Sequence, residues 1–372
     1  MPETTDVAIV GAGIVGCSAA LELAAAGLRV TVFEEKGPGP GATRAAAGIL
    51  SSQSDAEGPG PLLALGLAAR EAYPQLAEEL RSETGIDVGY RTRGTIVLAL
   101  DSGDEAELEH RYEWQSMAGL PVERLPAGRI HVLEPQVNRA VRQGLLFPLD
   151  HQLDNILLIQ ALSAFAGARG GTFRLGRRVE AVEESGGRVA GLRLAGERVR
   201  AGQVVIAAGC WSGQIQGLPE KIPVMPVRGQ MLSLDPDATI IEHVLFHSGR
   251  YLVPRWNGRL LVGSTLERAG FDATVTAGGI GRLISHALDI VPGLKDARIR
   301  EAWAGLRPGT EDGLPIIGRS SLSGLFYATG LFRSGILLGP LTGKLIAQLM
   351  LQGRASHSLQ PFDPLRFTPA SR

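Results

Sequence analysis

Apolar positions near the start of the chain follow first the pattern of a strand and then that of a helix. Residues 7–10 (VAIV) are apolar and mostly β-branched, as expected of a buried parallel strand. Residues 17–27 (CSAALELAAAG) are small and apolar and end in glycine, which indicates a helix packed on a sheet. Residues 29–35 (RVTVFEE) predict a second strand that ends at Glu34. The pattern therefore predicts a β-α-β unit at the start of the chain.

Further along, helical stretches alternate with stretches that have the period of a strand. Helices are predicted at 62–85 (interrupted near Pro74), 104–119 and 155–171. Antiparallel strands are predicted at 89–100, 224–234, 243–256 and 258–267, and a β-meander that returns to a buried strand at 177–211. Near the end, 324–330 (GLFYATG) predicts a strand, followed by a long helix that begins near Gly335 or Gly339 with Pro340 in its first turn.

A glycine-rich turn joins the first strand to the first helix. In GAGIVG, Gly11 permits a tight turn, Gly13 lets the backbone approach a pyrophosphate, and Gly16 lets the helix lie close to the strand. The free amides at the helix N-terminus favour phosphate binding. Glu34, at the end of the second strand, would accept hydrogen bonds from a ribose diol. The agreement of all these parts predicts a dinucleotide site and leaves open whether it binds FAD or NAD.

The helix near the C-terminus decides between the two cofactors. Its N-terminus, aimed at the pyrimidine end of a flavin, would stabilise the negative charge of the reduced ring. In an NAD enzyme this helix would have no evident function, so the sequence favours FAD. With β-α-β segments at both ends of the chain and antiparallel strands between them, we expect an α/β protein. It combines a Rossmann-like FAD-binding domain of the two-dinucleotide-binding type with a second, largely antiparallel substrate domain.

The predicted domains are discontinuous. The FAD-binding domain is predicted to comprise 1–85, 150–220 and 300–372, and the substrate-binding domain 86–149 and 221–299.

Composition narrows the class of partner and the compartment. The 372 residues carry a formal net charge of −1, which argues against nucleic acid as a partner. Cys17 and Cys210 are the only cysteines, so we predict neither a disulfide framework nor a metal centre, and a reducing, cytoplasmic location. No secretory signal is evident. The apolar C-terminal stretch is broken by Pro340 and Lys344, so we predict no transmembrane segment.

Nearly the whole chain resembles the glycine oxidase branch of the FAD-dependent D-amino-acid oxidase (DAO) family. The resemblance is carried by VAIVGAGIVG, TRAAAGIL, VVIAAGCWSG, YLVPR, AWAGLRPGTEDGLPIIGR and LFRSGILLGPLTGKLI. It implies oxidative deamination of glycine and other small amino acids or amines, with hydride transfer from Cα to flavin N5. The imine would hydrolyse to a 2-oxo acid such as glyoxylate plus ammonia, and O2 would be reduced to H2O2. It also implies a possible role in thiamine thiazole biosynthesis and a homotetramer.

The resemblance also assigns site residues. Arg307 would bind the substrate carboxylate with both prongs of its guanidinium, Tyr251 would sit over the substrate, and Arg333 would lie at the flavin edge. Val182 would hold the adenine through its backbone. The FAD contacts would include Gly11, Gly13, Ile14, Val15, Gly16, Glu34, Glu35, Ala42, Thr43, Ala47, Gly48, Ile49, Leu331, Phe332, Arg333, Ser334, Gly335, Ile336 and Leu337. Because neither cysteine lies in the C-terminal region, FAD should be held non-covalently.

Several alternatives stay open at this point. Arg307 could instead pair with Glu311 or Asp312, and Arg250 could shift the specificity toward an acidic or larger substrate. The polar, turn-rich stretch 51–61 suits a mobile lid. No residue is assigned as a catalytic base, because the flavin performs the hydride transfer. The rival functions are a D-amino-acid dehydrogenase that passes electrons to a quinone, and a non-catalytic flavoprotein subunit.

Overall fold

The predicted β-α-β unit forms the centre of one sheet. The computed structural model describes residues 4–238 and 240–367. Strand β1 (Thr4–Val10) pairs in parallel with β2 (Val30–Glu34), and helix α1 (Ile14–Ala25) crosses between them. The sheet runs in the order β17-β18-β11-β1-β2-β8, and β10 and β9 extend from β11. Its other strands are β8 (Thr172–Leu175), β9 (Val179–Ser185), β10 (Arg188–Leu194), β11 (Glu197–Ile206), β17 (Ile316–Arg319) and β18 (Leu325–Thr329).

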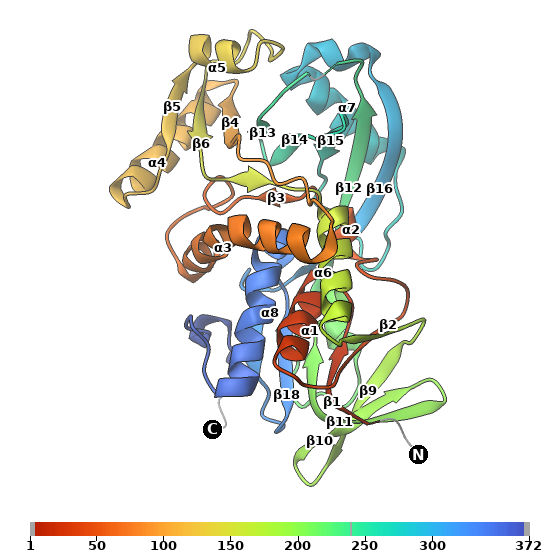
Figure 1. The fold of residues 1–372 in the computed structure, drawn as a ribbon. Helices are drawn as coiled ribbons and strands as arrows, with labels where there is room; N and C mark the ends of the chain where they lie inside the picture. The colour runs from red at the N-terminus through yellow and green to blue at the C-terminus, as the bar shows by residue number, and fades with distance from the viewer. Residues whose placement is uncertain (1–3, 239, 368–372) are drawn as a thin grey trace.

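Helices cover one face of this first sheet and the β-meander covers the other. The helical side buries apolar side chains of α1, α3 (Pro61–Thr84), α6 (Asn155–Ala168) and α8 (Gly335–Gln352). On the opposite face, side chains of β9, β10 and β11 pack against Phe33 and Tyr327. Figure 1 shows α1 and α8 beside each other in this lower part of the molecule, with the meander at its base. The first strand can be apolar throughout because both of its faces are covered.

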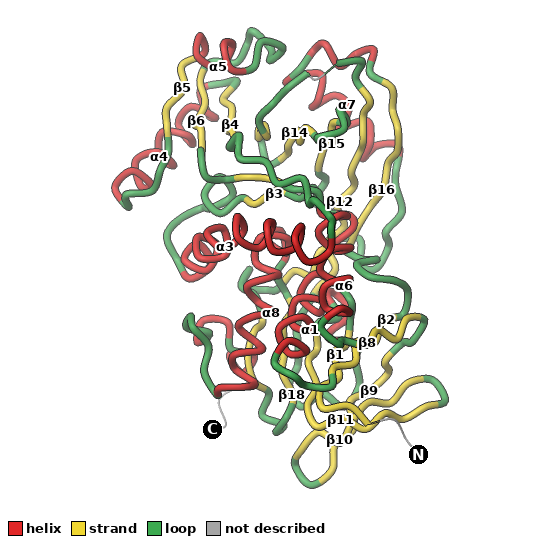
Figure 2. The backbone as a smooth tube through the Cα atoms, in the orientation of Figure 1, coloured by secondary structure: helices red, strands yellow, loops and turns green. Residues whose placement is uncertain are grey.

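A second sheet lies above the first (Figures 1 and 2). Its order is β16-β12-β15-β14-β13-β4-β6-β5, and all pairs are antiparallel except the parallel pair of β13 and β4. Its strands are β4 (Thr95–Ala99), β5 (Glu123–Pro126), β6 (Gln143–Phe147), β12 (Met225–Asp235), β13 (Val244–His247), β14 (Arg250–Pro254), β15 (Leu260–Gly263) and β16 (Arg298–Gly309). Helix α7 (Ala277–Ile290) packs on one face of this sheet, as its buried Leu283, Ala287 and Ile290 show.

Short elements connect the two sheets and complete the chain. They are α2 (Ala42–Ala45), β3 (Ile49–Leu50), α4 (Ser102–Met117), α5 (Ala127–Leu133), β7 (His151–Gln152), η1 (Gly209–Gln214), η2 (Pro292–Asp296), η3 (Phe332–Ser334), η4 (Gln360–Phe362) and η5 (Pro364–Phe367).

Two expected details of the secondary structure are corrected. Helix α3 continues through Pro74 without interruption, and the expected strand 89–100 is regular only in β4, at 95–99. The mixed α/β architecture with two multi-stranded sheets is otherwise as the sequence predicts.

Pro340 lies inside α8 rather than in its first turn, because the helix begins at Gly335. A proline there cannot donate to the carbonyl four residues earlier, which belongs to Ile336. The buried hydroxyl of Tyr73, on α3, donates to that carbonyl instead. Helix α8 therefore continues past Pro340 because a neighbouring helix supplies the missing hydrogen-bond donor.

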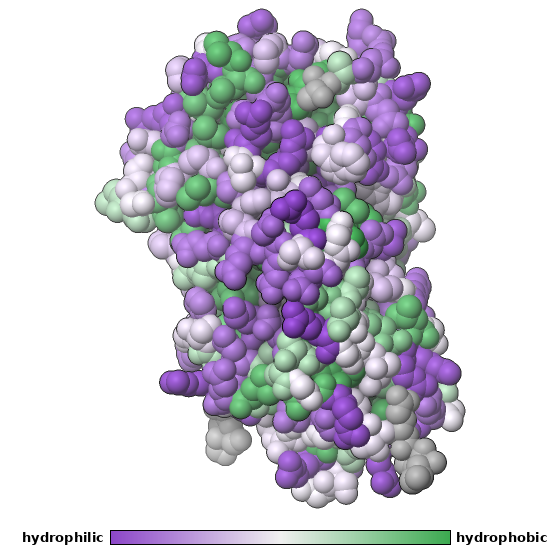
Figure 3. All heavy atoms as spheres, viewed as in Figure 1, coloured by the Kyte–Doolittle hydropathy of each residue, from purple (hydrophilic) through white to green (hydrophobic). Residues whose placement is uncertain are grey.

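Among residues 4–238 and 240–367, one helix has the length and composition of a membrane span. It is the segment Phe332–Gln352, and half of its most apolar window is buried inside the structure. The buried side chains pack against α1 and α3, so it is a core helix here. On the face shown in Figure 3, hydrophilic and hydrophobic residues are interspersed. The cytoplasmic location stays a prediction.

The predicted domain boundaries also stay a prediction. Their outer ends, at residues 1–3 and 368–372, lie outside the described residues. The boundary at residue 300 falls within β16, whose pairing with β12 runs from Arg298 to Gly309. All of this strand therefore belongs to the second sheet.

Candidate active site

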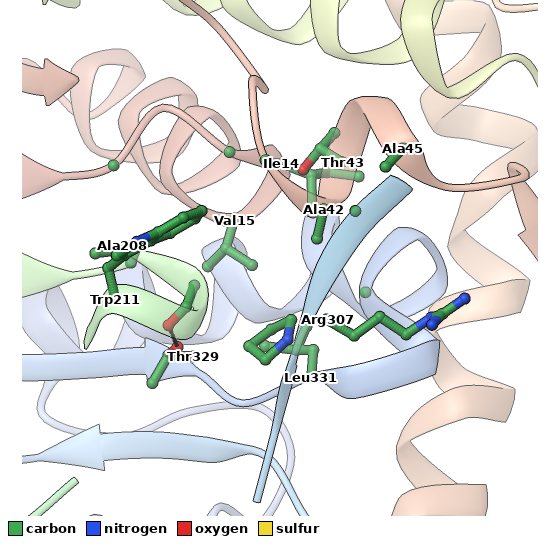
Figure 4. Close-up of a pocket in the computed structure, with 18 of the residues that line it drawn as sticks. Ile14, Val15, Ala42, Thr43, Ala45, Ala208, Trp211, Arg307, Thr329 and Leu331 are labelled. Atoms are coloured by element: carbon green, nitrogen blue, oxygen red, sulfur yellow. Dashed lines mark hydrogen bonds between the residues drawn. The ribbon is translucent and has the colours of Figure 1, made fainter. Parts of the chain in front are cut away.

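A cavity of about 840 Å³ lies where the two sheets meet. Its walls come from the turn after β1, the end of β2, α2, strands β12, β14 and β16, and the start of α8. Figure 4 shows Arg307 on one side of this space and Ala208 and Trp211 on the other, with Ile14 of α1 and Ala42 and Thr43 of α2 along one wall. A chamber with these walls is suited to an elongated ligand that reaches from the glycine turn to Arg307.

The glycine turn brings backbone to one end of the cavity. Gly11 has φ of 103°, a conformation that favours glycine. A side chain on Gly16 would overlap with the carbonyl oxygen of Gly11, so only glycine lets α1 lie this close to the turn. A Cβ on Gly13 would instead point into the cavity, with Thr43 Oγ1 as its nearest neighbour at 3.5 Å. Gly13 thus leaves room for a ligand, whereas Gly11 and Gly16 shape the turn.

Polar groups around the turn point toward the same end of the cavity. The N–H of Ile14, the first residue of α1, donates to Thr43 Oγ1 at 3.1 Å. The Glu34 carboxylate accepts from the N–H of Ala12 at 3.0 Å and from the N–H of Lys36 at 3.0 Å. The helix N-terminus, the threonine hydroxyl and the carboxylate are therefore held together before any ligand is considered. These are the groups that phosphates and a ribose diol require.

At the other end of the cavity, glycines of the second sheet leave space for larger side chains. Arg307 on β16 lies opposite Val227 of β12, so Gly229 is its diagonal neighbour on the same face. A Cβ on Gly229 would overlap with the guanidinium of Arg307. Gly263 would similarly overlap with the Met231 and Tyr251 side chains if it had a Cβ. Glycines thus clear a flat surface on which the guanidinium lies.

Arg307 has only neutral partners. Its Nη2 donates to Ser264 Oγ at 2.6 Å and its Nη1 donates to the carbonyl of Thr265 at 3.3 Å. In the described part of the chain no carboxylate forms an ion pair with it. The alternative pairing with Asp312 is wrong, because Asp312 pairs with Arg366 at 2.7 Å. Burial lowers the pKa of Arg307, yet an arginine remains charged at neutral pH. The site therefore holds a positive charge that lacks a counter-ion.

Tyr251 and Arg333 line the same end of the cavity. Tyr251 is buried on β14, its ring 5.5 Å from that of Phe246, and its hydroxyl donates only a weak hydrogen bond to Met231 Sδ at 3.4 Å. Arg333 forms a two-pronged ion pair with Asp55: Nε to Oδ2 is 2.9 Å and Nη2 to Oδ1 is 2.8 Å. Burial lowers the pKa of Arg333, but the ion pair with Asp55 outweighs burial and raises it.

Most of the residues that the sequence predicts for the site line this one cavity. They are Gly11, Gly13, Ile14, Val15, Glu34, Glu35, Ala42, Thr43, Ala47, Gly48, Ile49, Tyr251, Arg307, Leu331, Phe332, Arg333, Gly335 and Ile336. The cavity wall does not include Gly16, Val182, Ser334 or Leu337. Their roles in cofactor binding stay predictions, and Gly16 acts on the turn instead.

Val182 is the clearest difference, because its backbone N–H is already bonded to the carbonyl of Gln216 at 2.9 Å. Val179, three residues earlier on β9, lines the cavity instead. Arg250 also lies outside the cavity wall. Adjacent residues of a strand point to opposite faces, so Arg250 and Tyr251 cannot both face the cavity.

Sequence reasoning missed several residues of the cavity wall. Asp55 lay in a stretch interpreted as a mobile lid, and Ser264 had no motif around it. Gly229 was visible in VRGQM as a glycine inside a strand, which often marks a close approach to that strand. Trp211, to which the sequence analysis gives no role, lines the cavity and is 42% exposed.

The cavity suits FAD held without a covalent bond. The glycine turn and the helix N-terminus face one end, and the first turn of α8 faces the other part of the same space. Both cysteines are buried, and neither is on the cavity wall. Burial raises the pKa of Cys210 to about 12 and also raises that of Cys17, so neither thiol is a ready nucleophile. Residues 4–238 and 240–367 contain no cluster of three or more metal-ligating side chains.

Comparisons with known proteins agree with this geometry. The family model DAO, FAD dependent oxidoreductase, matches residues 6–349. A glycine oxidase from Geobacillus kaustophilus is 37% identical over 98% of both chains. A crystal structure of glycine oxidase from the same organism has a TM-score of 0.94 at 35% identity, with both chains fully covered. The bifunctional protein ThiO/ThiG from a Synechocystis species is 35% identical over 99% of this chain, which spans 55% of that protein.

Proposed function

Because the chain belongs to the DAO family of FAD-dependent oxidoreductases and is an amino acid or amine oxidase of that family, we propose that it catalyses the oxidative deamination of glycine and other small amino acids or amines. The observation that carries this proposal is Arg307, a guanidinium with no carboxylate partner, in the cavity that also contains the glycine turn. Its planar fork matches a carboxylate in two hydrogen bonds. A small amino acid supplies that carboxylate.

The protein's contribution is orientation and charge. When bound, FAD accepts the hydride from Cα, and the electrons pass on to O2 to give H2O2. Arg307 would fix the carboxylate and so limit the directions in which Cα can point. Ser264 and the Thr265 carbonyl hold the guanidinium in place. Tyr251, buried beside it, would cover the substrate and exclude water. No side chain is assigned as a base, because the neutral amine can lose hydride without one.

A metabolic role follows from one of the relatives. The imine product would hydrolyse to a 2-oxo acid, glyoxylate in the case of glycine, plus ammonia. We propose that the product of this chain can also serve thiazole formation in thiamine biosynthesis. The support is the ThiO/ThiG protein, in which a segment similar to this chain forms part of a bifunctional protein. The homotetramer expected from the family resemblance stays a prediction.

Anaerobic reduction of the bound flavin tests the proposal. The purified holoenzyme is mixed without oxygen with glycine, sarcosine, and D- and L-amino acids in turn, and the yellow absorbance of oxidised flavin is followed. We expect glycine and small amines to bleach it. If none of these compounds bleaches the flavin, the protein is a non-catalytic flavoprotein and the proposal is overturned.

Readmission of oxygen separates an oxidase from a dehydrogenase. An oxidase forms one H2O2 for each substrate molecule oxidised. Bleaching by glycine without formation of peroxide, together with fast reduction of a quinone, would assign the chain to the dehydrogenases instead.

A further inference from the structure

The two guanidinium groups at the substrate end of the cavity, those of Arg307 and Arg333, differ in their partners. Arg307 donates only to neutral oxygens, those of Ser264 and Thr265. Arg333 donates from Nε and Nη2 to the two oxygens of the Asp55 carboxylate, and the side chains are 24% and 31% exposed. All of Arg307, Arg333 and Asp55 line the same cavity. The charges of this end therefore sum to about one positive charge, which resides on Arg307.

The position of Asp55 is fixed by a buried anchor. The Asp150 carboxylate is fully buried and accepts hydrogen bonds from the backbone N–H groups of residues 52–54, at 2.7–3.2 Å. It also forms an ion pair with Arg70 at 3.0 Å, in which the side chains are 8% and 0% exposed. The stretch interpreted from sequence as a mobile lid is thus tied down as far as Ser54. Asp55 follows directly, so the anchor holds its carboxylate against Arg333.

This arrangement favours a substrate with one carboxylate. A second carboxylate on the substrate would meet the negative charge of Asp55. It would also find the charge of Arg333 already offset by the ion pair with Asp55. Charged groups in a binding site give specificity chiefly because a wrong ligand leaves a buried charge unpaired or brings two like charges together. Without the charge of Asp55, the substrate end would present two guanidinium groups that lack a carboxylate partner, those of Arg307 and Arg333.

We propose that Asp55 determines specificity, by occupying Arg333 and thereby restricting the pocket to substrates that carry a single carboxylate. This inference rests on the proposed oxidation of amino acids at this site. The role of Arg333 then depends on Asp55. While Arg333 is paired with Asp55 it does not bind a substrate carboxylate, and without that ion pair it can bind a second one. The substrate class of the enzyme is then set by a residue that need not contact glycine at all.

The test compares ligands with one and two carboxylates on the holoenzyme and on Asp55→Asn, which keeps the size of the side chain and removes its charge. Dissociation constants for acetate, malonate and succinate, none of which has an amine to oxidise, are measured from the change in the flavin spectrum. We expect the preference for a dicarboxylate over acetate to rise about tenfold or more. The ratio of kcat/KM for iminodiacetate to that for glycine should rise in the same direction.

Asp312→Asn is the matched control. Asp312 also forms an ion pair with an arginine, Arg366, and the two side chains are 36% and 18% exposed, close to the values for Asp55 and Arg333. It lies outside the cavity wall, so this variant should keep the ligand preference of the wild type. The double variant Asp55→Asn/Arg333→Gln should lose the gain for dicarboxylates, because the released guanidinium is absent. An unchanged preference in Asp55→Asn overturns the proposal.

Arg333→Gln carries the test if Asp55→Asn does not retain FAD. This variant leaves the Asp55 carboxylate without its partner, so the affinity for malonate relative to acetate must fall. If it rises or stays the same, the proposal is wrong. The binding ratios do not depend on turnover. A protein that oxidises no amine would therefore disprove the proposed function, while the ratios would still decide the role of Asp55.

Discussion

The two ends of the cavity are built in different ways. The nucleotide end is built mainly on one stretch, residues 10–49, to which 177–180 and parts of 207–216 add, and glycines in that stretch make its backbone groups accessible. The substrate end uses charged and aromatic side chains from separate strands and loops. Its ion pair joins residues 278 positions apart in the sequence. One end thus depends on local chain geometry, and the other depends on the docking of the two sheets.

This difference predicts which substitutions act on which function. At the nucleotide end, steric change to the backbone should remove the cofactor. At the substrate end, changes of charge should alter the affinity for substrates while FAD stays bound. The predictions below test that separation.

Gly16→Ala should have the largest effect on activity. A Cβ at this position would overlap with the backbone carbonyl of Gly11, which is held in the turn and cannot move as a flexible side chain can. We expect purified protein with little or no bound FAD, hence little activity, and a loss of stability of about 1–3 kcal/mol. The measurements are flavin content and thermal unfolding.

Gly281→Ala is the control for this prediction. Gly281 is also in a helix, α7, and a Cβ there would meet nothing within 4 Å. Alanine is favoured over glycine within a helix by about 1 kcal/mol, so this variant should keep its FAD and be no less stable. Full flavin content in Gly16→Ala would contradict the steric account of the turn.

Arg307→Ala should affect substrate binding and leave the cofactor in place. The variant removes a guanidinium at the substrate end that has no carboxylate partner, so carboxylate substrates lose charge-assisted hydrogen bonds. A loss of about 2–5 kcal/mol is expected for such a group, measured as a steep rise in KM with unchanged flavin content.

Arg319→Ala, in the same sequence stretch, is the control for Arg307→Ala. Arg319 donates to the carbonyl of Leu349 at 2.7 Å and stacks over Phe326, away from the cavity. Its substrate kinetics should match those of the wild type. Equal KM values for Arg307→Ala and the wild type would remove the basis for assigning the carboxylate to Arg307.

The same contrast explains which residues of the site could be predicted from the sequence. The glycine turn and Glu34 could be located because their spacing is local, and each residue type follows from one geometric need. Arg307 and Arg333 could be assigned only through the family resemblance. Asp55 could not be found, because its role depends on an ion pair across the fold and on a buried aspartate, Asp150, that no local pattern connects to it.

The role of Val182 stays a prediction. It lies on β9, and Val179 of the same strand lines the cavity. Which residue of a strand meets a ligand depends on the register and on where the strand meets its neighbours, and here Gln216 takes the N–H of Val182. Sequence spacing does not contain that information.

The smallest expected effect is a change in stability with pH, caused by a histidine that packs near the substrate end. His286 on α7 stacks on His247, with ring centroids 5.4 Å apart, and His247 is bonded to Asp104 at 3.1 Å. His247 ends β13 and pairs with Arg250 of β14, the strand that carries Tyr251. Burial, together with the charges of His247 and Arg250, lowers the pKa of His286 to about 4. The unfolded chain protonates His286 near its ordinary value of about 6.5.

Between these two values the unfolded state binds more protons than the folded state, so stability falls as pH falls. We expect this histidine to contribute a loss of about 1–3 kcal/mol between pH 6.5 and about pH 4. His286→Phe keeps a flat ring for stacking and cannot take up a proton, so its unfolding temperature should fall less steeply over this range than that of the wild type. Identical slopes would show that His286 does not govern the acid sensitivity. If lowering the pH reduces the flavin content before it changes KM, acid acts first on the nucleotide end. That result would contradict the separate behaviour of the two ends.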